Sequence, residues 1–334
     1  MKNVLFILSA ALSAGAYLLY EKGVEKEISV WLSIAVFQLF SFLSILLFTK
    51  PKFDFRALKN RKNMLVLGIC AVLDISGFYI LLDFISRDFE NALFMAFFKT
   101  LIDFCSINLN NFVFGDTFQN PHLYWIGFCM VAVFSVAFKY QDAGGKGFTL
   151  NFAEILLLLY YLTVSILKDV LVRLVTTSYD PQKRWVGFLN KNHAPLKEFN
   201  FSLFGIEFAI AFVFFLMAGG TFHQIADLGQ MTVITLCVIG LVTGIYTHNR
   251  SAIQNKKGKG YATALESYRI VPLYFLVQPL ILFIFDKHLN FNRFLSLETI
   301  VVCFIFMGSM ICFYRGKPNF NNPDQNINET IKNE

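Results

Sequence analysis

The sequence predicts an all-α integral membrane protein with ten transmembrane helices in two inverted five-helix repeats. Of its 334 residues, 56% are hydrophobic and 16% are charged, and the mean hydropathy is +0.54. A soluble domain has about 25% charged residues, so this chain has too few polar side chains to cover a globule. Its apolar residues also form blocks long enough to span a bilayer, about 20 residues each.

Charged or turn-forming residues separate ten apolar blocks, and each block is an expected span. The blocks cover residues 3–20, 30–48, 64–85, 91–114, 121–139, 152–174, 200–218, 230–252, 261–285 and 296–314. The first block could also be a signal peptide, because Lys2 precedes an apolar run that ends in small residues. An even number of spans and the symmetry described below favour a retained helix.

Lysine and arginine set the orientation of membrane helices, because they accumulate on the cytoplasmic side. Of the 29 in this chain, 19 fall on the side that holds both termini, and 7 fall on the other side. We therefore expect both termini to be cytoplasmic in a multi-pass protein of the cell (inner) membrane. The remaining three, Lys99, Lys168 and Arg269, lie within spans.

Neither a metal nor a cofactor is expected. The six cysteines lie inside apolar blocks, without the CxxC or Cys/His spacing of a metal site or a redox motif. The basic residues behind the net charge of +6 lie between the blocks, so they indicate membrane orientation rather than nucleic-acid binding. The expected partners are the lipid bilayer and a small-molecule substrate. No GxxxG pair marks a dimer face, and the oligomeric state stays open.

The chain is expected to divide into two repeats. The first covers residues 1–140, and a glycine-rich segment at 141–151 connects it to the second, which covers 152–315. Residues 316–334 are polar and rich in asparagine, which is typical of a disordered tail.

An ungapped overlay of residues 92–116 on 262–286 supports this division. It places Lys99 on Arg269 and Asp116 on Asp286. Because each half holds five spans, corresponding helices cross the bilayer in opposite directions. Inverted repeats of this kind typically hold their substrate site near the midplane, between the two halves.

Several motifs resemble the drug/metabolite transporter superfamily. The fourth span ends in "FGD" (114–116), and the fifth has a central glycine in "YWIGFCMVAVF" (124–134). The segments "ESYRIVPLYFLVQPLILFIFD" (266–286) and "ETIVVCFIFMGSMI" (298–311) are similar to the superfamily's ninth and tenth helices. The chain departs from the pattern where Asp103 lies near the place of the usual proline of the fourth helix.

The resemblance implies a secondary transporter that works by alternating access. Nucleotide-sugar and triose-phosphate transporters are distantly similar. In such phosphate-handling relatives, basic side chains on the fourth and ninth helices hold the anion, and Lys99 and Arg269 occupy the matching positions.

Polar residues on the fourth span form a stripe along one helical face: Lys99, Asp103, Ser106 and Asn110. Lys99 lies about 13 Å into the span, near the midplane. A charge at this depth usually faces a water-filled cavity, so Lys99 and Asp103 are candidate substrate-binding residues. The alternative is an i,i+4 ion pair between them that only stabilises the helix.

The ninth span has a similar pair. Glu266 and Arg269 are three residues apart, Tyr268 adjoins them, and Pro272 is expected to break the backbone hydrogen bond one turn earlier. A loosened turn beside a buried cation can expose polar backbone to a substrate. The two pairs together would suit a zwitterionic or anionic metabolite.

Further candidates are weaker. The resemblance implies that the first and sixth helices line the cavity, so Tyr17 and Tyr161 are candidate site residues, and the alternative for both is helix packing. Asp74 and Glu207 are intramembrane acids and candidates for proton coupling, or else they hydrogen-bond to neighbouring helices. Lys168 and Arg250 lie toward helix ends, where their cations are expected to snorkel to the interface, and the alternative is a functional role, for Arg250 that of a gate residue.

The leading hypothesis is a secondary active transporter of a small polar metabolite, with a central site between the repeats. An enzyme is not expected, because the chain has neither an HExxH motif nor a Cys/His cluster. A channel or a structural membrane subunit remains an alternative, and a polytopic membrane enzyme is a weaker one. A channel favours rings of like charge, whereas the intramembrane charges here have mixed signs.

Overall fold

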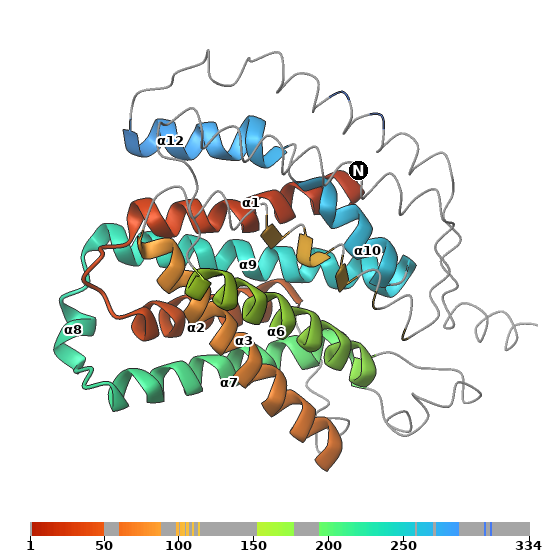
Figure 1. Cartoon of the computed structure of the whole chain (residues 1–334), viewed down its shortest axis with the longest axis horizontal. Coiled ribbons are helices and arrows are strands. Elements are labelled where there is room, and N and C mark those ends of the chain that lie inside the picture. Colours follow the sequence, from red (N-terminus) through yellow and green to blue (C-terminus); the bar gives the residue numbers. More distant parts are fainter. Residues whose placement is uncertain are drawn as a thin grey trace, which may run out of the picture.

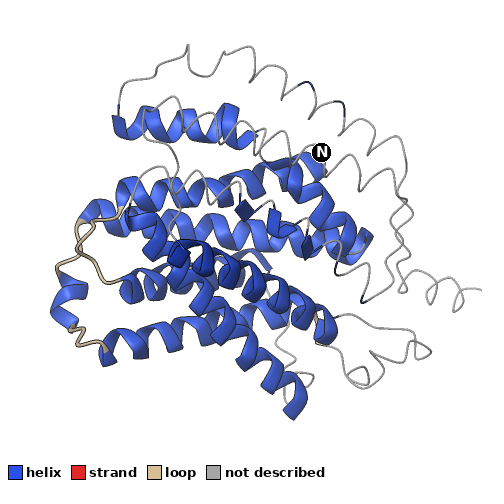
Figure 2. Ribbon diagram, in the orientation of Figure 1, coloured by secondary structure: helices blue, strands red, loops and turns tan. Residues whose placement is uncertain are grey.

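The computed structural model describes residues 2–49, 60–87, 152–176, 194–257, 259–269 and 272–286, with residues 98–99, 101–103, 105–106, 109, 113, 304 and 308. Every element within these ranges is helical (Figure 2). The expected fifth and tenth spans, the 141–151 connector and the 316–334 tail lie outside the described residues, apart from residues 304 and 308. The few described positions of the fourth span are helical.

Six described helices are long and apolar enough to cross a membrane. They are α1 (Lys2–Gly23), α2 (Val30–Thr49), α3 (Arg61–Arg87), α6 (Phe152–Thr176), α7 (Leu196–Met217) and α9 (Gln230–Lys257). Each corresponds to one of the expected spans. Helices satisfy their own backbone hydrogen bonds, which hydrocarbon cannot do. These helices therefore indicate a membrane-embedded protein and confirm the expected helical class for the residues that the structure describes.

The remaining elements are short. Helix α8 (Phe222–Ala226) lies between α7 and α9 and is capped by Thr221, with Gln224 bonding back to its backbone N–H. The ninth expected span is broken into α10 (Lys259–Glu266), a 3₁₀ turn η1 (Ser267–Arg269), a π-helical turn η2 (Leu273–Val277) and α12 (Gln278–Asp286). Pro272 lies between the two irregular turns, so the helix is interrupted where the proline predicts it.

The bundle is arranged around α2 and α9. Helix α2 packs against both α7 and α9, and α1 packs along the other side of α9 (Figure 1). Helix α3 packs against α6 and α7, while η2 and α12 lie against α1. The described helices thus enclose a space bounded by α1, α3, α6, α7 and α9.

Two glycines allow α9 to approach α2 closely. A Cβ atom at Gly240 would lie 2.6 Å from the Phe37 carbonyl oxygen and 2.4 Å from the Phe40 Cβ atom. One turn later, Gly244 lies against Ser44, whose hydroxyl donates a 3.2 Å hydrogen bond to the Leu241 carbonyl. Small residues are typical of helix contacts in membranes, where close packing replaces the hydrophobic effect as the driving force.

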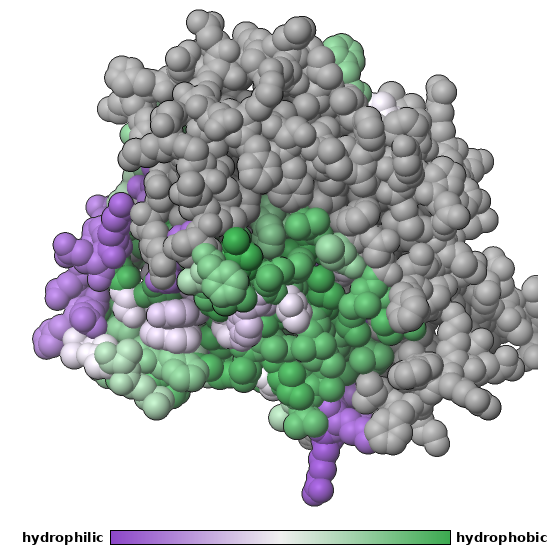
Figure 3. Space-filling model, in the orientation of Figure 1, coloured by the Kyte–Doolittle hydropathy of each residue, from purple (hydrophilic) through white to green (hydrophobic). Residues whose placement is uncertain are grey.

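The outer surface of the bundle is apolar. Large side chains such as Leu47, Leu65 and Phe152 are 66–75% exposed. Figure 3 shows an apolar face over the described helices, with strongly hydrophilic residues mainly at its edges. A soluble monomer rarely exposes so large an apolar patch, and here the patch is suited to contact with lipid.

Candidate functional site

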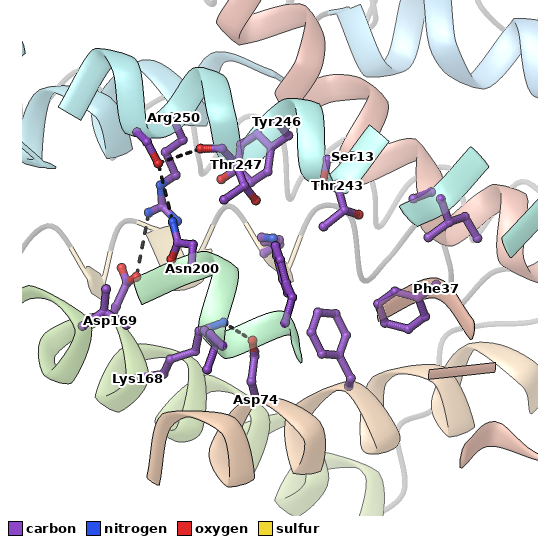
Figure 4. Close-up of a pocket in the computed structure, with 18 of the residues that line it drawn as sticks. Ser13, Phe37, Asp74, Lys168, Asp169, Asn200, Thr243, Tyr246, Thr247 and Arg250 are labelled. Carbon is purple, nitrogen blue, oxygen red and sulfur yellow. Dashed lines mark hydrogen bonds and ion pairs between the residues drawn. The ribbon is translucent and has the colours of Figure 1, made fainter. Parts of the chain in front are cut away.

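A cavity of about 160 Å³ lies inside the apolar bundle, and its largely apolar lining includes charged and hydroxyl side chains (Figure 4). A single water needs only about 10–15 Å³ of such space, so the cavity could hold a small solute. Residues from α1, α2, α3, α6, α7 and α9 line it, together with Lys99. Its charged lining consists of the cations Lys99, Lys168 and Arg250 and the acids Asp74 and Asp169.

Helix α9 contributes the longest lining stripe. Ile239, Thr243, Tyr246, Thr247, Arg250, Ser251 and Gln254 follow one another at intervals of one to four residues, on one face of the helix. Ser13, Tyr17 and Tyr20 form a similar stripe on α1. Both stripes place hydroxyl groups along the cavity, where they can donate hydrogen bonds to a polar solute or accept them from one.

An ion pair crosses from α6 to α3 at one wall. The Lys168 ammonium contacts the Asp74 carboxylate, and both side chains line the cavity (Figure 4). The expectation that Lys168 snorkels to the interface is therefore wrong. Its side chain reaches a partner in the middle of α3, because an ammonium in apolar surroundings is stabilised more by a carboxylate than by exposure to lipid.

A second ionic network runs from α6 through α9 to the broken helix. Arg250 lies 3.8 Å from the Asp169 carboxylate and 3.4 Å from that of Glu266. Glu266 also accepts a 2.7 Å hydrogen bond from Arg269 and one from the Tyr246 hydroxyl. Arg250 thus connects two elements, and it does not behave as a helix-end cation turned toward the interface.

Arg269 closes this network with a contact to the fourth span. Its Nη2 atom lies 2.8 Å from Oδ2 of Asp103, while Nη1 bonds to Glu266. Arg269 and Glu266 are each 1% exposed. The expected i,i+3 pair between Glu266 and Arg269 is present, and Asp103 pairs with Arg269 as well.

Lys99 is arranged differently from the other cations. It lines the cavity with its ammonium 5.9 Å from the centre of the Tyr246 ring, a cation–π contact. Within the described ranges it has no ion pair, so the alternative of an i,i+4 pair with Asp103 is not what the structure contains. Its ammonium is therefore left facing the cavity and an aromatic wall.

The three tyrosines among the expected site residues differ in position: one lines the cavity and two are buried elsewhere in the bundle. Tyr17 lines the cavity. Tyr161 is buried, and its ring stacks on that of Phe98 with the centroids 6.5 Å apart. Tyr268 is buried within the 3₁₀ turn between Glu266 and Arg269.

Glu207 is fully buried in the middle of α7. Among the described residues its carboxylate oxygens have no N–H or O–H donor, and the side-chain hydrogen-bond partner within reach is the Asp74 carboxyl group, with which Glu207 can share a proton. Asp74 and Lys168 are the charged groups that act on it electrostatically. Glu207 is therefore a close neighbour of the ion pair at the cavity wall, although it is not among the residues that line the cavity.

The residues missed by sequence reasoning had a readable signal. Thr243, Tyr246, Thr247 and Arg250 repeat at helical spacing, the same criterion that identified the stripe of the fourth span. The distance of Lys168 and Arg250 from the helix centre concealed their role. Long side chains reach the middle of a bundle from positions more than one turn away.

The charged residues do not form a metal centre in the described part of the chain, where no group of three or more His, Cys, Asp or Glu side chains could hold an ion.

No protein-family model matches the sequence, and no curated protein is significantly similar to it.

Proposed function

We propose that this chain is a secondary active transporter that moves a small polar metabolite, zwitterionic or anionic, across the membrane by alternating access. The observation that carries the proposal is the cavity of about 160 Å³, which places five charged side chains inside a bundle of apolar helices. Ionisable groups inside a membrane bundle are costly and usually serve a solute or ion pathway.

The arrangement of charges favours a solute with a negative group. Lys168 and Arg250 already contact carboxylates, whereas Lys99 has no ion pair within the described residues. A substrate carboxylate or phosphate could neutralise Lys99, and the tyrosine and threonine hydroxyls of α1 and α9 could bind its polar parts. Arg269 is already engaged by Asp103 and Glu266, so we assign it to positioning these acids rather than to direct contact with the substrate.

Helix packing supports the proposed inverted repeat. Under an exchange of the two halves, the first three spans α1, α2 and α3 would correspond to α6, α7 and α9. The contact of α1 with α9 then corresponds to that of α6 with α3, and the contact of α2 with α9 corresponds to that of α7 with α3. All four contacts are present, and α2 packs against its own counterpart α7. Rocking of one half against the other is the motion that such repeats use.

The proposed orientation keeps both termini in the cytoplasm, as the distribution of Lys and Arg indicates. The cytoplasmic ends of α6, α7 and α9 would then surround Val172, Leu196 and Gln254 at one end of the cavity. A solute would enter or leave the cytoplasm there.

The test begins with an untargeted comparison of metabolites between cells that contain the protein and cells that lack it. Solutes whose level changes are then supplied to proteoliposomes that hold the purified chain. We expect saturable uptake by the wild type and loss of uptake by Lys99→Ala and Arg269→Ala, while the matched variant Lys26→Ala in an exposed loop keeps it.

Two results would overturn the proposal. Sustained open-pore current through the reconstituted protein would identify a channel. Full uptake by both Lys99→Ala and Arg269→Ala would show that the central charges do not serve transport.

A further inference from the structure

The cavity wall between α3, α6 and α7 holds more acidic than basic side chains. Asp74 and Lys168 are in contact, and Glu207 acts electrostatically on both. If all three were ionised, the group would carry one net negative charge. Lys168 carries a single positive charge and already contacts Asp74. Glu207 is therefore left without a counter-ion of its own.

The surplus persists when the surrounding network is included. The charged residues that line the cavity or take part in the ionic contacts described above are four cations and five acids: Lys99, Lys168, Arg250 and Arg269 against Asp74, Asp103, Asp169, Glu207 and Glu266. Four of the acids contact a cation. Glu207 is the fifth, and it is fully buried without a contacting cation among the described residues.

The helices packed against α7 offer Glu207 little compensation. Helix α2 carries no ionisable side chain, and α9 uses Tyr246 and Arg250 in contacts with Glu266. Gln38 of α2 is also fully buried, and its amide atoms have no partner among the described residues. The other titratable groups near the trio are Cys70 on α3 and Tyr161 on α6, both uncharged at neutral pH.

Gln38 of α2 and Glu207 of α7 lie at a similar height along these two packed helices. Trp31 of α2 stacks on Phe214 of α7 at one level, and Phe42 stacks on Phe201 at another, with centroids 4.9 and 4.3 Å apart. These two contacts fix an antiparallel register that places both residues between them. Among the described residues, the α2–α7 contact therefore holds the polar atoms of Gln38 without partners at the depth of Glu207. It supplies Glu207 with no cation.

We infer that Asp74, Lys168 and Glu207 form a proton-binding site that couples proton binding to solute binding in the transporter proposed above. With Lys168 on Asp74, the trio holds one proton, on Glu207. A solute anion that sits beside Lys99 and also contacts Lys168 draws Lys168 away from Asp74, and Asp74 then binds a second proton from the cavity water. One proton therefore enters with each negative charge, and no net charge accumulates.

The geometry provides a route for this exchange. Asp74 and Lys168 line the cavity, and their side chains are 15% and 26% exposed. Glu207 is fully buried and within side-chain hydrogen-bonding reach of Asp74. A proton can therefore reach Glu207 through Asp74, and a change at Lys168 affects both acids.

Infrared spectroscopy of the full chain in lipid vesicles tests the site without any solute. We expect the wild type at neutral pH to show the carbonyl stretch of a protonated carboxyl group, shifted by exchange into D₂O. Glu207→Gln should lose this band, while Glu27→Gln, the same change in an exposed loop, should keep it. Asp74→Asn should also lose it, because Glu207 then takes Lys168 as its counter-ion and ionises.

A band that persists unchanged in Glu207→Gln would overturn the inference, and so would one that persists in Asp74→Asn. Thermal unfolding gives a second measurement that needs only folded protein. Glutamine has the shape of a protonated glutamate, so Glu207→Gln should match the wild type at low pH and exceed its midpoint at high pH. A lower midpoint at every pH would mean that the ionised carboxylate is required.

The inference depends on the proposed transport function only for its role, so the two can fail separately. A chain that transports no solute would still show the infrared band if the trio binds a proton. A transporter driven by another ion would lack the band and still take up its solute.

Discussion

Arg269 and Asp103 are 166 positions apart in the sequence, yet their side chains lie 2.8 Å apart in the bundle. The contact joins the broken ninth segment to the fourth span, and therefore the two halves of the chain. It also neutralises Asp103, which leaves Lys99, four residues earlier, without an ion pair in the described part of the structure. A contact distant in sequence thus decides which cation of the cavity is left without an ion pair.

Removal of Arg269 should destabilise the bundle strongly. Arg269→Ala leaves Asp103 without its guanidinium and takes one of the donors from Glu266, and breaking a buried ion pair in this way costs about 3–5 kcal/mol. We expect a lower midpoint of thermal unfolding in detergent. The double variant with Asp103→Asn should recover part of the loss, because the unpaired carboxylate is then removed. Equal loss in the single and double variants would contradict the pairing.

The close approach of α2 and α9 should be sensitive to one added side chain. Gly240→Val would place atoms against the Phe37 carbonyl and Phe40, and overpacking of this kind costs about 1–3 kcal/mol. Gly68→Ala is the matched control, because no atom lies within 4 Å of the added Cβ. It should stabilise α3 by about 0.5–1 kcal/mol, the helix preference of alanine over glycine. Thermal midpoints of the two variants should move in opposite directions.

The Tyr246 hydroxyl should contribute to stability through Glu266. Tyr246→Phe keeps the ring that lies near Lys99 but removes a buried hydrogen bond to a carboxylate, which costs about 1–3 kcal/mol. Tyr160→Phe is the control, because its hydroxyl bonds to Ser76 at an exposed position. Similar thermal midpoints for the two variants would show that the contact with Glu266 contributes nothing.

The cavity should be accessible to water. In a variant without native cysteines, Thr243→Cys should react with a charged, water-soluble thiosulfonate, because a thiolate forms where water is present. Leu47→Cys, on the lipid-facing surface, should not react, because a thiolate does not form in hydrocarbon. The extent of labelling can be read by mass spectrometry of the intact protein. Protection of both positions would mean that the cavity is closed to solvent from both sides.

The sequence by itself determined the six long helices that the structure describes and the break in the ninth segment. These features depend on local rules. Hydrocarbon requires each span to satisfy its own backbone hydrogen bonds, so a run of apolar residues is enough to specify a helix. Pro272 lacks a backbone N–H, and the i,i+3 spacing of Glu266 and Arg269 brings them together wherever the turn forms.

Only the tertiary structure decided which charges meet. The sequence offered Lys99 as a local ion-pair partner for Asp103, but Asp103 lies against Arg269. Lys168 contacts Asp74 and Arg250 contacts Glu266, instead of reaching the interface. Hydropathy and helical spacing give the depth and face of a residue but not its neighbours on other helices. In a low-dielectric interior opposite charges attract strongly, and which of them meet follows from how α3, α6, α9 and the broken helix pack together.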